Sequence, residues 1–157
     1  SRTFAVFVTN LQTHLEANLA DVGFGLSQVL PVLVEGLWGT PRSTVLLEQP
    51  EIHLHPAAQL ALADLLLEMA RLPRARTVIV ETHSEHIISR VQRRVADGTI
   101  SPEEVALWYV ESTFEGSRCS RIDIDSRGQL VEETIPKGFL REGFAESLEH
   151  ARALASR

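Results

Sequence analysis

The sequence predicts an α/β fold: a mainly parallel sheet with helical crossovers, plus a small antiparallel hairpin and a C-terminal helix. Residues 44–47 and 77–80 are short apolar runs, a pattern typical of strands that are buried on both faces. Another apolar run, residues 105–110, follows them, and segments with helical periodicity separate the runs. Because strands and helices alternate in this order, we expect parallel pairing through helical crossovers.

The segment before the first strand predicts two helices. Residues 3–19 carry apolar side chains at intervals of three and four, which is typical of an amphipathic helix. These side chains belong to Phe4, Phe7, Val8, Leu11 and Leu15. A glycine-containing turn at residues 21–25 ends this helix, and Ser27 has the side chain of an N-cap for a second helix through Leu37. Pro31 is tolerated because it lies near the first turn of that second helix.

The central part of the chain alternates helices with strands. Residues 39–41, Gly-Thr-Pro, end the second helix and lead into the first strand. Pro56 begins a long helix over residues 57–71, whose leucines form a broad apolar face. After the second strand, a further helix begins near Ser84 and ends near residues 97–98, Asp-Gly.

The C-terminal part predicts a hairpin and a closing helix. Residues 119–125 and 129–134 flank a Ser-Arg-Gly turn, in which Gly128 is expected to take a positive φ. Residues 141–155 have the pattern of an amphipathic helix. We therefore divide the chain into a main lobe at residues 1–112 and an extension at residues 113–157.

Composition limits the classes of function. The chain has 157 residues, 44% of them hydrophobic and 23% charged, which suits a globular domain with a hydrophobic core. No apolar stretch approaches the roughly 18 residues of a membrane span, so we expect a cytoplasmic protein without a membrane partner. The net charge of −6 argues against nucleic-acid binding over the whole surface. The densest positive clusters, arginines 71, 74 and 76 and arginines 90, 93 and 94, are interpreted as solvated helix ends rather than a local binding patch.

Three single residues bear on the extent and chemistry of the chain. It opens on Ser1 rather than methionine, which suggests a fragment of a longer protein. Its only lysine is Lys137, so it lacks the Gly-rich turn followed by Lys that a phosphate-binding P-loop requires. Its only cysteine is Cys119, which excludes an internal disulfide.

Polar residues follow both predicted parallel strands directly. Glu48 and Gln49 come after the first strand, and Glu81 and His83 come at the end of the second. In open α/β sheets ligands bind at the carboxyl ends of the strands, where a buried acidic residue would otherwise be costly. If the strands are adjacent, His83 approaches Glu48 across one crevice.

These residues resemble motifs of a known family. Residues 44–56, an apolar run followed by Glu-Gln-Pro-Glu-Ile-His-Leu-His-Pro, resemble the Walker B motif and D-loop of ABC-type ATPases, most closely the OLD-like branch related to RecF and chromosome-maintenance ATPases. Residues 81–84, Glu-Thr-His-Ser, resemble the switch-histidine motif of that family. Residues 23–28, Gly-Phe-Gly-Leu-Ser-Gln, resemble its signature motif but depart from the common Leu-Ser-Gly-Gly-Gln. The likeness is strong over residues 20–90, and residues 135–139 resemble a C-terminal extension found on some bacterial members.

The resemblance implies ATP and Mg²⁺ as cofactors and assigns a role to each matching residue. Glu48 would hold Mg²⁺, usually through water, and His83 would contact the γ-phosphate or position the attacking water. A signature set would donate hydrogen bonds to the γ-phosphate of a nucleotide held by a second subunit: Gly25, Ser27 and Gln28. His55 would lie at the dimer seam. The expected partners are a P-loop lobe, supplied N-terminally or by another chain, and a second copy in a homodimer.

Gln49 is the departure with the largest consequence. Members of the family usually carry at this position the glutamate that activates water, and an amide cannot accept a proton at neutral pH. We therefore expect slow hydrolysis, with Glu51 or His83 as a substitute base, or a switch that uses ATP binding without turnover. Residues 1–157 alone are expected to lack ATPase activity.

Two other classes of function remain open. The first is a degenerate lobe that does not hydrolyse ATP and binds a partner protein or DNA. The second is a metal-dependent hydrolase, because four histidines follow the strands: His53, His55, His83 and His86. The family branch implies DNA maintenance or defence against phage as the biological setting.

Overall fold

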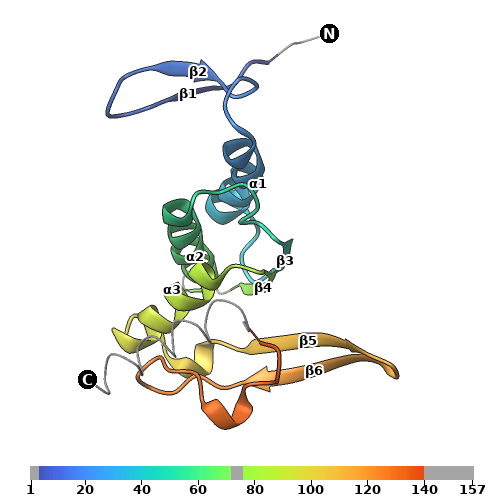
Figure 1. Cartoon of the computed structure of the whole chain (residues 1–157). Coiled ribbons are helices and arrows are strands. Elements are labelled where there is room, and N and C mark those ends of the chain that lie inside the picture. Colours follow the sequence, from blue (N-terminus) through green and yellow to red (C-terminus); the bar gives the residue numbers. More distant parts are fainter. Residues whose placement is uncertain (1–3, 72–75, 140–157) are drawn as a thin grey trace, which may run out of the picture. The chain divides into compact units, whose positions relative to one another are not determined.

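The computed structural model describes residues 4–71 and 76–139, and it confirms the α/β class. The chain divides into two compact units, Ser1–Arg90 and Val91–Arg157. The first holds an antiparallel hairpin, a parallel strand pair and the helices that pack on it, and the second holds a further antiparallel hairpin (Figure 1). The boundary after residue 112 that we expected between lobe and extension stays a prediction.

The predicted helix at residues 3–19 is wrong, because this segment forms a hairpin. Strands β1 (Phe7–Thr9) and β2 (Glu16–Asn18) pair antiparallel. The side chain of Asn10 explains the turn: its Oδ1 accepts the backbone N–H groups of Gln12 at 2.9 Å and Thr13 at 3.0 Å. Such local bonds compete with helical ones. A helical stripe also needs a surface to pack on, and Leu11 is 85% exposed.

Helix α1 (Phe24–Trp38) begins earlier than its predicted N-cap at Ser27. Gly23 takes the N-cap position and makes no capping bond with a side chain. The Ser27 hydroxyl instead donates to the carbonyl oxygen of Phe24 at 2.8 Å, one turn back inside the helix. Because glycine can hold the N-cap backbone without a side-chain acceptor, the first serine in the segment is a misleading start signal.

Pro31 lies in the interior of α1 rather than in its first turn, so the helix tolerates the loss of one backbone hydrogen bond there. The buried Gly36 faces α2 (Pro56–Ala70): an added Cβ would lie 3.2 Å from Leu65 Cδ1 and 3.4 Å from Met69 Sδ. Gly39 ends α1, as predicted.

The predicted parallel pair is present. Strands β3 (Thr44–Glu48) and β4 (Thr77–Glu81) pair parallel, and α2 lies between them in sequence as the predicted crossover. The register places Glu48 opposite Glu81 at the carboxyl ends.

Burial of β3 and β4 on both faces was predicted wrongly. On one face Val45 is 8% exposed, whereas on the other Leu46 is 71% and Ile79 is 52% exposed. In the part of the chain that the structure describes, this sheet has two strands only. The inner face packs on helices α1 and α2 in a core of Val32, Val45, Leu62, Ala63, Leu66, Met69 and Ile87.

Arg76 is a structural residue, which corrects its interpretation as part of a solvated helix end. Its side chain is fully buried. The guanidinium donates to three carbonyl oxygens at the end of α1, those of Glu35 at 2.6 Å, Thr40 at 3.1 Å and Gly39. It also lies 3.6 Å from the Glu35 carboxylate. A cation at a helix C-terminus satisfies its free carbonyls and its dipole. Arg74 lies outside the described residues.

Helix α3 (Glu85–Ala96) has the start and end that the sequence predicts. Ser84 Oγ accepts the N–H of Ile87 at 3.1 Å, as an N-cap does. Gly98, just beyond the helix, has φ 73°.

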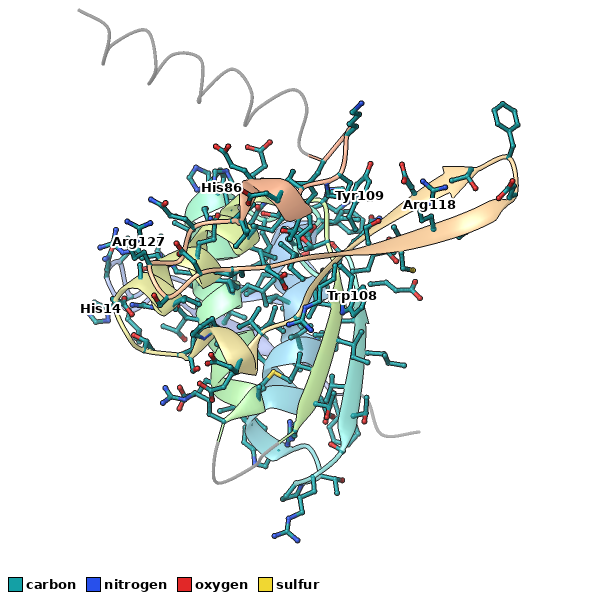
Figure 2. All side chains as sticks on the ribbon, turned by 90° about the horizontal axis from the view of Figure 1, so that it is seen from below. His14, His86, Trp108, Tyr109, Arg118 and Arg127 are labelled. Carbon is teal, nitrogen blue, oxygen red and sulfur yellow. The ribbon has the colours of Figure 1, made fainter. Side chains whose placement is uncertain are left out.

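The strand predicted at residues 105–110 does not join the parallel sheet. It forms β5 (Leu107–Thr113), after the short 3-10 helix η1 (Pro102–Glu104), and pairs antiparallel with β6 (Gly116–Ile122). The two residues between the strands are too few for a parallel crossover, which needs about a dozen. Trp108 and Arg118 lie on this hairpin (Figure 2).

The hairpin predicted from residues 119–125 and 129–134 is reduced to one isolated bridge between Ile124 and Leu130. Its turn is as expected, since Gly128 has φ 75°. The 3-10 helix η2 (Glu132–Thr134) follows, and the ring of Phe139 then packs edge-on against Tyr109 at a centroid distance of 5.8 Å.

Two further expectations concern helices. The helix predicted at residues 141–155 lies outside the described residues. Among the residues that are described, no helix is long and apolar enough to cross a membrane.

Candidate functional site

The ends of β3 and β4 place two carboxylates side by side. Glu48 and Glu81 are register partners, both exposed, and the backbone N–H of Gln49 extends the ladder by donating to the Glu81 carbonyl oxygen at 2.8 Å. Since side chains alternate along a strand, both carboxylates share the exposed face with Leu46 and Ile79. The two strand ends are therefore adjacent, which is the condition on which the expected approach of His83 to Glu48 depends.

Gln49 is held in an uncommon conformation. Its φ is 45°, a region that residues other than glycine seldom adopt. Its side-chain amide donates to Glu81 Oε1 at 3.2 Å. Positive φ values of this kind are concentrated at functional sites, where the surrounding contacts enforce them.

Glu51 is buried and holds the turn that follows β4. Only 6% of the residue is exposed. Its Oε1 accepts the hydroxyl of Thr82 at 2.5 Å and the backbone N–H of His83 at 3.0 Å. Within the described residues its other oxygen, Oε2, is buried without a hydrogen-bond partner. The carboxylate that hydrogen-bonds the His83 segment is thus Glu51, while the expected approach of His83 to Glu48 stays a prediction.

Gln59 makes a second link between the same two segments. Its Nε2 donates to the Leu54 carbonyl oxygen at 3.0 Å, and its Oε1 accepts the Ser84 hydroxyl at 2.6 Å. Sequence reasoning missed Gln59, Thr82 and Ser84 as site residues. Thr82 and Ser84 flank His83 in the motif at residues 81–84, and Gln59 lies one helical turn after His55, where α2 begins.

The loop from Gln49 to His55 is tightly folded. Backbone N–H groups of Ile52 and Leu54 donate to carbonyl oxygens three residues back, those of Gln49 at 3.2 Å and Glu51 at 3.0 Å. His55 Nδ1 accepts the N–H of Ala57 at 3.3 Å, so this histidine caps α2. Its expected place at a dimer seam stays a prediction.

A hollow of about 500 Å³ opens beside these links. Its lining residues are Glu51, Ile52, His53, Gln59, His83, Ser84, Glu85 and His86. Three of the four histidines considered for a metal-dependent hydrolase therefore line one hollow: His53, His83 and His86 (the last is labelled in Figure 2). Nevertheless, among the described residues no three His, Cys, Asp or Glu side chains gather as a metal site. The histidine-based hydrolase gains no support from this arrangement.

The signature-like segment packs on the same loop. A Cβ at Gly25 would lie 2.6 Å from the His53 carbonyl oxygen and 3.1 Å from Leu54 Cδ2. The ring of Phe24 lies 6.1 Å from that of His53. Ser27 and Gln28 are exposed on α1. Gly25 is thus joined to the loop after β3, while the predicted γ-phosphate contacts of all three signature residues stay predictions.

Comparison with known proteins identifies the family. A protein-family model described as the AAA ATPase domain matches residues 4–88, more than half of the chain. The match spans β3, the Glu48–His55 loop and the turn that carries His83. No curated protein and no solved structure matches the chain. On the extent of the family match, the chain belongs to the AAA ATPase domain family, whose function class is nucleotide binding of the ATPase type.

Proposed function

We propose that this chain is the C-terminal part of an ABC-type, OLD-like ATPase that binds Mg-ATP at a dimer interface once it is joined to a P-loop lobe. The observation that carries the proposal is the arrangement of two parallel strand ends. Glu48 and Gln49 end one strand, and His83 follows the other in a turn that is tied to the first by Glu51. Ligands of α/β proteins bind at such carboxyl ends.

The residues at the strand ends fit Mg²⁺. Glu48 and its neighbour Glu81 supply hard carboxylate oxygens on one exposed face. Magnesium is usually bound by one or two carboxylates together with substrate phosphates and waters, so a cluster of three protein ligands is not required. When bound, Mg²⁺ would neutralise charge on the nucleotide phosphates.

The uncovered face of the sheet supports a further lobe. Parallel sheets are normally covered on both faces, and a pair of strands is marginal on its own. Leu46 and Ile79 nevertheless expose 71% and 52% of their surface on the face that carries Glu48. A P-loop lobe that packs over this face would bury them and bring the phosphates to the strand ends.

The start of α1 supports the nucleotide contact across a dimer. The first backbone N–H groups of a helix lack partners within the helix, and they attract anions unless a side chain caps them. At Gly23 no side chain caps α1, and Ser27 and Gln28 are exposed nearby. We propose that Gly25, Ser27 and Gln28 offer donors to a γ-phosphate held by a second copy.

Slow turnover follows from Gln49. Its amide cannot act as a base, and it is engaged with Glu81. Removal of a general base typically lowers the rate by about 10²–10⁴-fold. His83 lines the hollow and remains the candidate to position water.

Titration of Mg-ATP into the protein joined to its P-loop lobe tests the proposal. We expect binding that depends on Mg²⁺, a low rate of phosphate release, and loss of that release in Glu48→Gln. Glu68→Gln is the matched control, because it removes an exposed carboxylate from the far part of α2. Failure of the joined protein to bind Mg-ATP would reject the proposal.

A second candidate is a lobe that binds nucleotide or a partner, protein or DNA, without hydrolysis. The Gln49 to Glu81 contact favours it, because the side chain at the position of the usual base, Gln49, is already hydrogen-bonded to Glu81. The same assay separates the candidates: phosphate release that Glu48→Gln abolishes excludes this one. A role in DNA maintenance or phage defence is proposed from the resemblance to the OLD-like branch.

A further inference from the structure

We propose that Glu51 is a positioning residue that fixes His83, and that it does not itself act as the base that activates water. This inference rests on the proposed function for its kinetic consequence. It assigns to a buried carboxylate the task of holding a turn 32 residues away in sequence.

The geometry of Glu51 leaves its carboxylate little access to a water molecule. The residue is 6% exposed, and Oε1 already accepts two hydrogen bonds, from Thr82 Oγ1 at 2.5 Å and from His83 N at 3.0 Å. Oε2 has atomic exposure below 1 Å² and no partner among the described residues. A base must reach the proton that it removes, directly or through one water.

The turn that carries His83 is held on both sides. Glu51 binds Thr82 and the His83 backbone, and Thr82 Oγ1 in turn accepts the Ser84 N–H at 3.0 Å. On the other side, Gln59 accepts the Ser84 hydroxyl at 2.6 Å. The His83 backbone is therefore fixed by the segment after β3, while the residue itself stays exposed at the hollow.

This arrangement has a mechanical consequence for the site. An exposed imidazole can position water or a phosphate oxygen only if its backbone is fixed, because a small displacement lowers the rate strongly. Glu51 and Gln59 both belong to the segment that begins at the Glu48 strand end. A displacement of that loop would therefore move His83 with it.

The first test measures the contact itself, in residues 1–157. In Glu51→Ala we expect the amide hydrogen of His83 to exchange roughly tenfold faster, the effect of one lost hydrogen bond to a charged group. Glu51→Gln keeps an oxygen acceptor and should retain most of the protection. Glu68→Gln is the matched control and should leave the exchange rate of the His83 amide unchanged. The Val45 amide should exchange at its wild-type rate in every variant. Unchanged exchange at His83 in Glu51→Ala overturns the proposal.

The second test measures turnover in the protein joined to its P-loop lobe. A positioning role predicts that Glu51→Ala lowers kcat about as strongly as His83→Ala, with little change in KM, and that Glu51→Gln restores most of the rate. Combined with His83→Ala, Glu51→Ala should add less than about a threefold loss, because coupled residues are not additive. A base role predicts the opposite: no rescue by Gln, and a full further loss in the double variant.

The two tests keep separate failures apart. If the wild-type joined protein binds Mg-ATP but shows no turnover, hydrolysis is rejected, and His83 exchange alone decides the positioning role. If Glu51→Ala does not fold, Thr82→Val replaces it, since this variant removes one of the two donors to Oε1. We then expect about threefold faster exchange at His83, and no change would reject the proposal.

Discussion

The two strand pairs β3–β4 and β5–β6 differ in the direction of pairing and in the side chains on their exposed faces. Each is a sheet of two strands with one partly buried and one exposed face in the described residues. In β3–β4 a long crossover helix makes the pair parallel, and Leu46 and Ile79 stand on the exposed face. In β5–β6 a connection of two residues makes the pair antiparallel, and its exposed face sets Trp108 opposite Arg121.

The difference shows where a partner is to be expected. Antiparallel sheets commonly leave one face in water, with polar and apolar side chains mixed on it. Parallel sheets rarely do, so the exposed side chains of Leu46 and Ile79 on the outer face of β3–β4 are the anomaly. That face also carries Glu48 and Glu81, which places the expected cover and the candidate nucleotide site at the same strand pair.

The largest predicted effect is a loss of stability in the first unit, Ser1–Arg90, which holds β3–β4, when Arg76 is replaced. Arg76→Ala removes the guanidinium that donates to the carbonyl oxygens of Glu35, Gly39 and Thr40. Loss of several charged hydrogen bonds from a buried site costs about 3 kcal/mol. We expect the free energy of unfolding of the first unit, measured in urea, to fall by this amount.

Site-resolved hydrogen exchange supplies the control for that experiment. Protection should fall at Val45 in Arg76→Ala and stay unchanged at Ile122 in the second unit. Arg71→Ala, which removes an exposed arginine from the end of α2, should change stability by less than about 0.5 kcal/mol. If both arginine variants lost the same stability, the hydrogen bonds from Arg76 to the end of α1 would make no special contribution to the fold.

The next largest effect concerns Gly128 in the second unit, Val91–Arg157. Its φ is 75°, and an added Cβ would collide with the carbonyl oxygen of Gln92. A non-glycine residue in this region costs roughly 1–2 kcal/mol before any collision. We expect Gly128→Ala to destabilise the second unit by about 2 kcal/mol or more in chemical denaturation.

Gly98→Ala is the matched control for Gly128. Gly98 has nearly the same φ, 73°, but nothing lies within 4 Å of an added Cβ. This variant should therefore show only the backbone cost of about 1 kcal/mol. If both variants lose the same stability, the close approach of Gln92 to Gly128 makes no energetic contribution.

Local sequence signals account for the elements that were predicted well. Pro56 and Ser84 mark the starts of α2 and α3, and Gly128 marks its turn, because each residue's own conformational preference decides the structure there. The predicted pairing of β3 with β4 follows from the helix between them. From that pairing, the meeting of Glu48 with the Glu81 strand end could be expected.

The failures share a different cause. The apolar spacing of residues 3–19 predicts a helix only if a core is there to receive it, and Asn10 folds the chain back first. The burial of Arg76 depends on α1 ending beside β4. The bond from Glu51 to His83 joins residues far apart in sequence, so it depends on the assembled pair of strands. Sequence periodicity carries no record of such contacts.

The smallest predicted effect is a dependence on pH of the turn at residues 125–129 in the second unit. The backbone N–H of Gln129 donates to Asp125 Oδ1 at 2.8 Å and, with the N–H of Arg127 at 2.9 Å, lowers the pKa of this carboxyl below its ordinary value. The folded state thus favours the charged form. The turn gains stability above the unfolded pKa of about 3.9, and this gain is lost as pH falls through the lower folded pKa.

Amide chemical shifts of Gln129 and Arg127, followed from pH 7 to about pH 2, measure this titration. Both should move together, with a midpoint below that of an unstructured peptide of the same sequence. Asp125→Asn keeps an oxygen acceptor in the turn but has no proton to gain, so its two amides should not follow a carboxyl titration. A midpoint equal to that of the peptide would mean that the two N–H groups do not hold the charged form. The turn would then owe its shape to Gly128, whose positive φ does not depend on pH.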